Sequence, residues 1–355
     1  MSLSNTFREL VEIDSPSGQE QAVAKYLEIW LTSQNFEYFK DDIGNILAFR
    51  SGSGEPLLLC AHMDVVDPCL GVKPSFINGV VKSDGTTVLG ADNKASIAAI
   101  IKGVEDYLAQ TGEPRAIEIL FAVKEETGGG VEFMDFSKIK SKQGIIFDLI
   151  KPIGTIAIAS PYIYNFHIKF TGKSSHASRP DEGKSALKPA AKLITSADDG
   201  FLDNGLTTIN FGKIEAGTGI NIIPETATIH GEVRSFKKDL FEAHLEAIEK
   251  MAKKCASEDG VKVDFTTDGR CAGYEFPEDD TFIKKISAVL AKNGHKIVFY
   301  KTSGISDSNP LVEAGIKVVT LGDGITKAHT VEEEISLESL ESMRALVFDF
   351  LQKLD

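Results

Sequence analysis

The chain has 355 residues, 42% of them hydrophobic and 25% charged, a composition typical of a soluble globular protein with one large or two moderate domains. A formal net charge of -14 without an offsetting basic stripe argues against a nucleic-acid or anionic-membrane partner. No apolar segment predicts a signal peptide or a membrane span, and the four cysteines form no Cys-x-x-Cys pair, so we expect a cytoplasmic protein.

The first half of the chain alternates predicted helices and strands. Apolar residues at helical spacing predict a helix before residue 14 and another over residues 20–31. Four short apolar runs predict strands: residues 45–49, 57–61, 117–123 and 144–147. The small and aliphatic residues at 93–102 predict a packed helix. This alternation indicates an α/β fold with a mixed, mostly parallel sheet flanked by helices.

Potential metal ligands stand where these elements begin or end. His62 follows the second strand, Asp148 follows the fourth, and Asp92 precedes the packed helix. Glu125 and Glu126 come just after the third strand, and open α/β sheets place their chemistry beyond the carboxyl ends of such strands. Two adjacent carboxylates repel, so a cation or a shared proton is needed to hold both there. A Glu-Glu pair alone is more often solvated surface, but its neighbours favour a metal ion.

The pattern of predicted elements changes at about residue 161. Residues 161–272 follow a β-α-β-β-α-β order, which is the ferredoxin-like plan, and their length of about 110 residues suits an inserted domain. Beyond residue 273 the first pattern returns, with a loop that carries His329. We therefore predict a discontinuous catalytic domain of residues 1–160 and 273–355 around an inserted lid domain.

The predicted ligands are nitrogen and oxygen donors without thiolate. Such a set suits Zn²⁺, Co²⁺ or Mn²⁺ better than Cu(I) or an iron–sulfur cluster. One metal needs only about three or four protein ligands. A larger set with several carboxylates indicates two bridged metals.

These residues form an ordered series of motifs. The series is His62-x-Asp64, the segment from Gly90 to Asp92 with the following Asn-Lys-Ala, Glu125-Glu126-Thr-Gly, Asp148 and His329. It resembles the dinuclear-zinc exopeptidases of the peptidase T, carboxypeptidase and aminoacylase superfamily, most closely the branch similar to peptidase T, a tripeptide aminopeptidase. The resemblance covers nearly the whole chain.

The resemblance implies a role for each ligand. Asp92 would bridge two divalent metal ions, with zinc favoured and cobalt or manganese as alternatives. His62 and Asp148 would complete one site, and Glu126 and His329 the other. The family also implies a short peptide as the substrate.

Two further acidic residues would serve catalysis in such an enzyme. Glu125 would be the free carboxylate that takes a proton from the attacking water and gives it to the leaving amine, as a general base and then a general acid. Asp64 would orient the imidazole of His62, and its structural alternative is a turn-capping aspartate.

The predicted lid carries substrate-binding candidates by the same resemblance. His176 and Asn221 would help to hold the developing oxyanion, and Arg234 would clamp a carboxylate. The structural alternatives are a surface histidine for His176 and a strand-edge ion pair for Arg234. Dimeric relatives send a lid histidine into the partner's active site, which leaves a homodimer through the lid open.

The leading hypothesis is a metal-dependent exopeptidase that removes the N-terminal residue of short peptides. The alternatives within the same chemistry are an N-acyl amino acid deacylase or desuccinylase and a carboxypeptidase, because only the groups that recognise the flanks of the amide differ. A non-catalytic binding module is a remote alternative, because such a module would have lost ligands and this chain retains the whole set.

Overall fold

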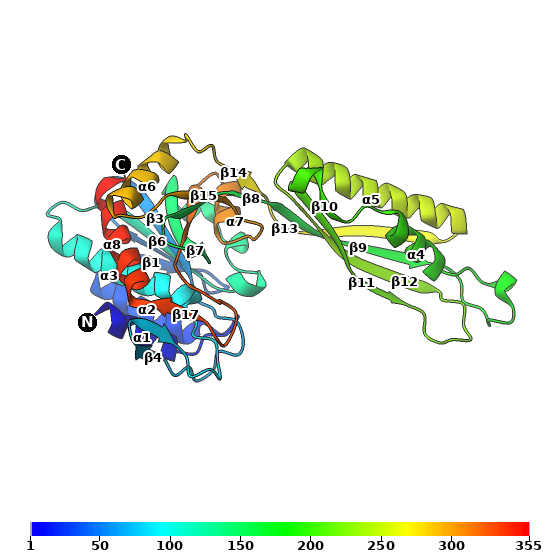
Figure 1. Cartoon of the computed structure of the whole chain (residues 1–355), viewed down its shortest axis with the longest axis horizontal. Helices are drawn as coiled ribbons and strands as arrows, with labels where there is room; N and C mark the ends of the chain where they lie inside the picture. The colour runs from blue at the N-terminus through cyan, green and yellow to red at the C-terminus, as the bar shows by residue number, and fades with distance from the viewer. Residues whose placement is uncertain (1, 355) are drawn as a thin grey trace. The chain divides into compact units, whose positions relative to one another are not determined.

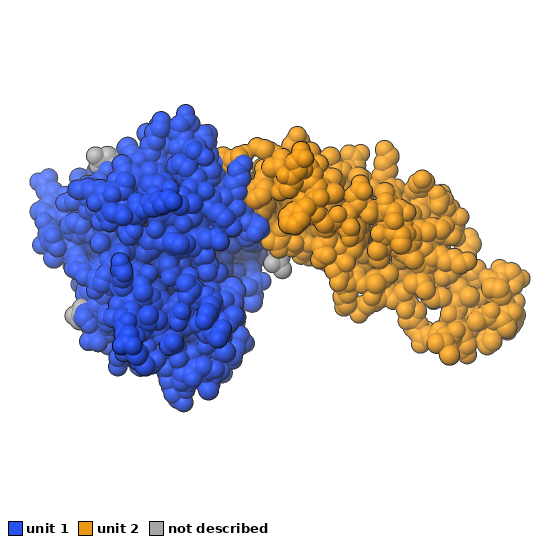
Figure 2. All heavy atoms as spheres, viewed as in Figure 1, with its two compact units in different colours: residues 1–159, 276–355 blue, residues 160–275 orange. Residues whose placement is uncertain are grey.

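The computed structural model describes residues 2–354, without the side chains of residues 270 and 271. The chain divides into two compact units, Met1–Ala159 with Phe276–Asp355 and Ser160–Glu275 (Figure 2). Among the described residues, no helix is long and apolar enough to cross a membrane.

Unit 1 is built on a mixed sheet with the strand order β1-β2-β6-β3-β7-β16-β8, and β15 pairs with β8. Four central strands, β6, β3, β7 and β16, run parallel to one another. Strand β2 is antiparallel to β6, and β1 is antiparallel to β2. The strands are β1 Glu37–Lys40, β2 Ile46–Arg50, β3 Ser53–His62, β6 Arg115–Ala122, β7 Gln143–Leu149, β8 Thr155–Ser160, β15 Val298–Lys301 and β16 Lys317–Gly322. Apart from the first four residues of β3, the central strands are mostly buried, as expected for parallel strands covered on both faces.

Helices cover this sheet, and α3 and α8 pack against each other (Figure 1). The α-helices of unit 1 are α1 Leu3–Glu12, α2 Gln21–Ser33, α3 Ala91–Gln110, α6 Thr281–Lys292, α7 Ser308–Glu313 and α8 Leu337–Lys353. Helix α3 is buried on nearly all sides because its small and aliphatic residues allow close neighbours. A smaller sheet joins β4 Ser75–Ile77, β5 Val80–Lys82 and β17 Glu334–Ser336.

Unit 2 has one antiparallel sheet in the order β10-β11-β12-β9-β13, with α4 and α5 packed on one face (Figure 1). Its elements are β9 Tyr162–Thr171, α4 Leu187–Ser196, β10 Gly200–Leu202, β11 Thr207–Ala216, β12 Thr226–Ser235, α5 Lys238–Asp259 and β13 Lys262–Cys271, and β14 Tyr274–Glu275 ends the unit. Apart from the short β10, this is the ferredoxin-like arrangement predicted from the sequence. The predicted fold class is therefore confirmed.

Several elements differ from the sequence prediction. Helix α7 and the hairpin of β4 and β5 are not among the predicted elements. Strands β1, β8 and β17 were not predicted either. Four of these five missed strands are only three or four residues long, too short for a clear period in the sequence.

Candidate metal centre

The predicted ligands meet at the carboxyl ends of the parallel strands. His62 is the last residue of β3, Asp148 lies near the end of β7, and Glu125 and Glu126 follow β6 in a short 3₁₀ turn, Glu125–Thr127. Because β6, β3 and β7 are neighbours and run in the same direction, their carboxyl ends share one edge. Asp92 joins them from the first turn of α3.

Two pairs of side chains flank the carboxylate of Asp92. Its Oδ1 lies 3.2 Å from Nε2 of His62, and this nitrogen is 3.6 Å from Oδ1 of Asp148. Its Oδ2 lies 3.3 Å from Nε2 of His329, which is 3.1 Å from Oε1 of Glu126. One carboxylate thus faces a different histidine with each oxygen. The structure brings together all five residues that sequence reasoning assigned as ligands.

Asp64 connects one histidine to the turn that carries both glutamates. The Nδ1 of His62 lies 3.0 Å from the backbone oxygen of Asp64 and 3.3 Å from its Oδ1. The backbone N–H groups of Glu125 and Glu126 donate to Oδ1 and Oδ2 at 3.0 and 3.2 Å, and the Ser17 hydroxyl donates to Oδ2 at 2.6 Å. A proton on Nδ1 leaves the Nε2 lone pair of His62 facing Asp92 and Asp148, the tautomer that a metal ligand needs.

The centre concentrates negative charge against two histidines. The carboxylates of Asp92 and Glu126 beside its Nε2 outweigh burial and raise the pKa of His329 to about 10. Burial raises the pKa of Asp148 to about 6, although His62 opposes the shift. Burial, with the charge of Asp148, also raises the pKa of Glu125 well above its usual value. Divalent cations would neutralise this excess.

The donor set fits such cations. Oε1 of Glu126 is buried and accepts no well-aligned hydrogen bond from the described residues, despite its short distance to His329. His62, Asp92 and Glu126 each offer an atom within 4.8 Å of the others. Nitrogen and carboxylate donors at such spacing suit zinc and its first-row neighbours.

Three further residues lie around the centre, and none of them had a role predicted from the sequence. Glu333 is buried and accepts the backbone N–H groups of residues 90 and 92 at 2.8 and 2.9 Å, so it fixes the start of α3. The amide of Asn93 donates to Oδ1 of Asp148 at 2.8 Å. Asp323 follows β16 fully buried, and burial together with the charge of Asp92 raises its pKa well above the usual value. Of these three residues, only Asn93 belongs to one of the sequence motifs, because it directly follows Asp92.

The lid candidates fall into two groups at opposite ends of the unit 2 sheet. His176 and Asn221 are exposed and lie in adjacent segments, where the N–H of Ala177 donates to the backbone oxygen of Asn221 at 2.9 Å. Arg234 lies towards the other end of β12 and forks onto Glu232, with bonds of 2.5 and 3.0 Å.

The register of the strands measures this separation. Arg234 pairs with Ile163, whereas Thr226 pairs with Thr171, the last residue of β9 before the loop of His176. Eight residues along a strand span about 26 Å. One lid therefore cannot bring His176 and Arg234 to the same bond of a short peptide.

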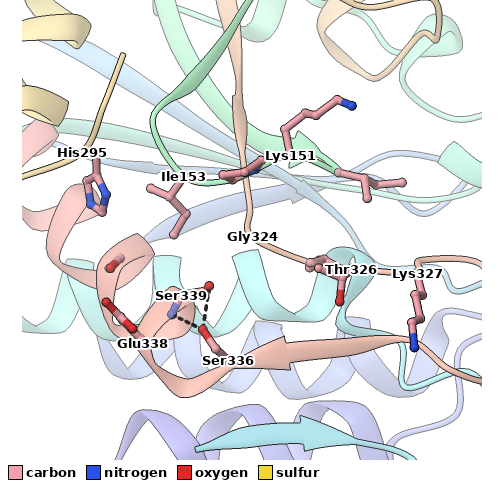
Figure 3. A pocket seen from close by; sticks show the side chains of 13 residues that line it. Lys151, Ile153, His295, Gly324, Thr326, Lys327, Ser336, Glu338 and Ser339 are labelled. Atoms are coloured by element: carbon pink, nitrogen blue, oxygen red, sulfur yellow. Dashed lines mark hydrogen bonds between the residues drawn. The ribbon is translucent and has the colours of Figure 1, made fainter. Parts of the chain in front are cut away.

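Unit 1 also contains a cavity of about 600 Å³, which residues 324–327 of the loop before His329 help to line (Figure 3). The segment that follows Asp148 forms one wall, with Lys151 and Ile153, and Gly324 and Lys327 form another.

Comparison with known proteins was made for the whole chain. Residues 158–260 match the family described as the peptidase dimerisation domain of M20 peptidases. The crystal structure of the aminopeptidase PepT from Bacillus cereus superposes with a TM-score of 0.93, at 30% identity over 99% of this chain and 98% of that one. A tripeptidase structure from Staphylococcus aureus gives a TM-score of 0.91 at 29% identity, over 99% and 97% of the two chains.

Sequence relatives also match nearly the whole chain. The protein YqjE of Bacillus subtilis is 30% identical over 99% of this chain and 98% of its own length. A probable carboxypeptidase of Emericella nidulans is 28% identical over 94% of this chain and 85% of its own length. The chain is thus similar both to an aminopeptidase and to a probable carboxypeptidase. These similarities alone do not decide from which end of a peptide a residue is removed.

Proposed function

The chain belongs to the M20 family of metallopeptidases and is a hydrolase, and from this premise we propose that it removes the N-terminal residue of short peptides, tripeptides in particular. The position of Asp92 between two histidines carries the metal-dependent hydrolysis, and the similarity to the aminopeptidase PepT and to the tripeptidase supports the choice of the N-terminal residue. It supports two metal ions, one held by His62 and Asp148 and the other by Glu126 and His329, with Asp92 between them. Zinc is the proposed metal.

Two divalent ions bound there would polarise the scissile carbonyl and lower the pKa of the attacking water. Glu125 is the remaining carboxylate of the turn, and we assign it the proton transfer from water to the leaving amine. Its backbone is tied to Asp64, which is also in contact with His62. The base and one ligand therefore share a single support.

The lid supports a homodimer as the working form. Arg234 lies about 26 Å along the strand from Thr226, and His176 and Asn221 lie in the segments beyond Thr226, so one copy supplies only one of these groups to a given substrate. The match of the lid to a peptidase dimerisation domain agrees with a second copy supplying the other. His176 and Asn221 would then stabilise the developing oxyanion, whereas Arg234 must leave Glu232 before it can clamp a substrate carboxylate.

The test is the identity of the products. The purified protein, loaded with zinc or cobalt, is incubated with tripeptides of three different residues and with N-acetylated or N-succinylated amino acids, beside a chelated sample. Metal-dependent release of the N-terminal residue, read by mass spectrometry, supports the aminopeptidase. Release of the C-terminal residue or cleavage of only the acylated compounds assigns the carboxypeptidase or the deacylase instead.

The variant Glu125→Gln tests the assignment of the base. It should retain two metals per chain and lose most of its turnover, by about 10²- to 10⁴-fold, because the amide cannot accept the proton. Loss of metal from Glu125→Gln, with metal retained in Glu126→Gln, would mean that the two glutamates have the opposite roles.

A further inference from the structure

The sheet of unit 2 has an open face that carries two histidines on neighbouring strands. Side chains alternate along a strand, and Phe166 and Ile168 of β9 point into the core beneath α4 and α5. His167 lies between them and points to the other face. On β12, Ile229 belongs to the same core, so His230 also points to the open face.

The two imidazoles converge on one point. His167 and His230 are directly opposite each other in the register of β9 and β12, and their Nδ1 atoms are 2.7 Å apart. The other ring nitrogen of His167, Nε2, lies 3.1 Å from Oδ2 of Asp268 on β13. Three strands thus contribute one side chain each to a connected set.

Two nitrogen lone pairs that point at one position share either a proton or a metal ion. Zinc–nitrogen bonds of about 2.0–2.1 Å in tetrahedral geometry place two nitrogens roughly 3.3 Å apart, so the two rings would have to separate by roughly 0.6 Å from their observed 2.7 Å to hold one ion. A histidine that binds metal commonly donates its second ring N–H to a carboxylate, which fixes its tautomer. Asp268 occupies that place for His167, and this is an independent sign of a metal ligand.

The surroundings leave room for further ligands. The pair borders a hollow of about 340 Å³ that also contacts Asn165, Asn210 and Glu232. Lys213 lines the hollow as well, and its Nζ lies 3.0 Å from Oε1 of Glu215. A β-bulge beside Gly212 shifts the register of β11 next to His230. Bulges of this kind are frequent at functional sites because they redirect neighbouring side chains. Arg234 forks onto Glu232, so the asparagine oxygens and water are the available additional donors.

We propose that His167 and His230 form a metal site in unit 2, separate from the centre around Asp92, that takes a late first-row dication. Imidazole ligands suit Cu²⁺, Ni²⁺ and Zn²⁺, and affinity in this series is highest for Cu²⁺. Both histidines are half-buried, so the bound ion exchanges with ions in solution more readily than one in a buried centre. It binds its metal independently of peptidase activity.

The test uses the full chain, first loaded with zinc and then titrated with Cu²⁺. The expected result is one additional Cu²⁺ per chain, with two-nitrogen hyperfine coupling in its electron paramagnetic resonance spectrum. His167→Gln and His230→Gln should lose it and keep the peptidase activity of the unsubstituted chain. His244→Gln is the matched control, because His244 is a lid histidine paired with Asp203 and lies outside the site.

A second measurement needs no variant. Cu²⁺ should protect His167 and His230, but not His244, from modification by diethylpyrocarbonate, as read by peptide mass mapping. Equal Cu²⁺ uptake by all variants, or equal modification with and without Cu²⁺, would overturn the proposal. The pair would then share only a proton.

Discussion

The substitution Asp64→Asn tests the support beneath the metal centre. The two carboxylate oxygens of Asp64 accept the N–H groups of Glu125 and Glu126, and the side chain is fully buried. Burial alone would raise the pKa of Asp64, but its contacts with His62 and its hydrogen bonds from Ser17 and Glu125 lower it. The folded protein therefore favours the charged form, and a neutral amide loses that preference.

The magnitude follows from the donors. Asparagine keeps one oxygen, so one of the two N–H groups loses its acceptor and faces an NH₂ group instead. A hydrogen bond to a charged group contributes about 1.5–3 kcal/mol, so the free energy of unfolding of the metal-free protein should fall by about that amount. Metal affinity should fall about 10- to 100-fold, because Asp64 orients the histidine that would bind the metal.

The assay is urea unfolding in the presence of a chelator, followed by the fluorescence of Trp30, the single tryptophan, which lies in α2 of unit 1. Metal affinity is measured separately by competition with a chromogenic chelator. Ser17→Ala removes one donor to the same charged carboxylate and should cost about 1.5–3 kcal/mol. Asp42→Asn removes the same charge at an exposed position and is the control. An unfolding midpoint and a metal affinity for Asp64→Asn equal to those of the control would refute the reasoning.

Further predictions concern protons, packing and metal. Because the pKa of His329 is raised to about 10, this histidine is protonated in the metal-free protein at neutral pH, and metal binding must release the proton. Affinity should therefore rise with pH until about 10, and calorimetry in buffers of different ionisation enthalpy should detect the proton; no release would contradict this. Gly103→Ala should destabilise by about 1–2 kcal/mol in urea unfolding, because its Cβ would lie 2.6 Å from that of Val347, whereas Gly112→Ala, with open space, should not. Removing the metals should lower the midpoint of thermal unfolding, because ions that bind only the folded protein stabilise it. An unchanged midpoint after full chelation would contradict this.

The proximity of the predicted ligands could be foreseen because local patterns and one rule of topology agree. His62 and Asp148 stand at the ends of apolar runs that are short enough for interior strands. In a parallel sheet all such ends meet at one edge, so the positions of the ligands in the sequence already indicate proximity in space. His329 lies 181 residues after Asp148, and its assignment rested on the resemblance to a family.

The remaining elements could not be read from the sequence because their stability comes from tertiary pairing. Strand β17 has three residues and forms by pairing with β5, some 250 residues earlier in the chain. Helix α7 has six residues, too few to show a helical period. The lid was easier to predict, because its strands of ten residues alternate clearly over a packed face.

The supporting residues escaped detection because they act on backbone groups or on other side chains. Glu333 stands in a run of three glutamates, which in a sequence indicates a solvated surface. Its neighbour Glu332 is exposed, whereas Glu333 is buried against the N–H groups that begin α3, and only the path of the chain separates the two. The comparison can be tested: Glu333→Ala should lower both stability and metal affinity, because two buried donors lose their acceptor, and Glu332→Ala should change neither. Equal behaviour of the two variants would mean that the start of α3 does not depend on this carboxylate.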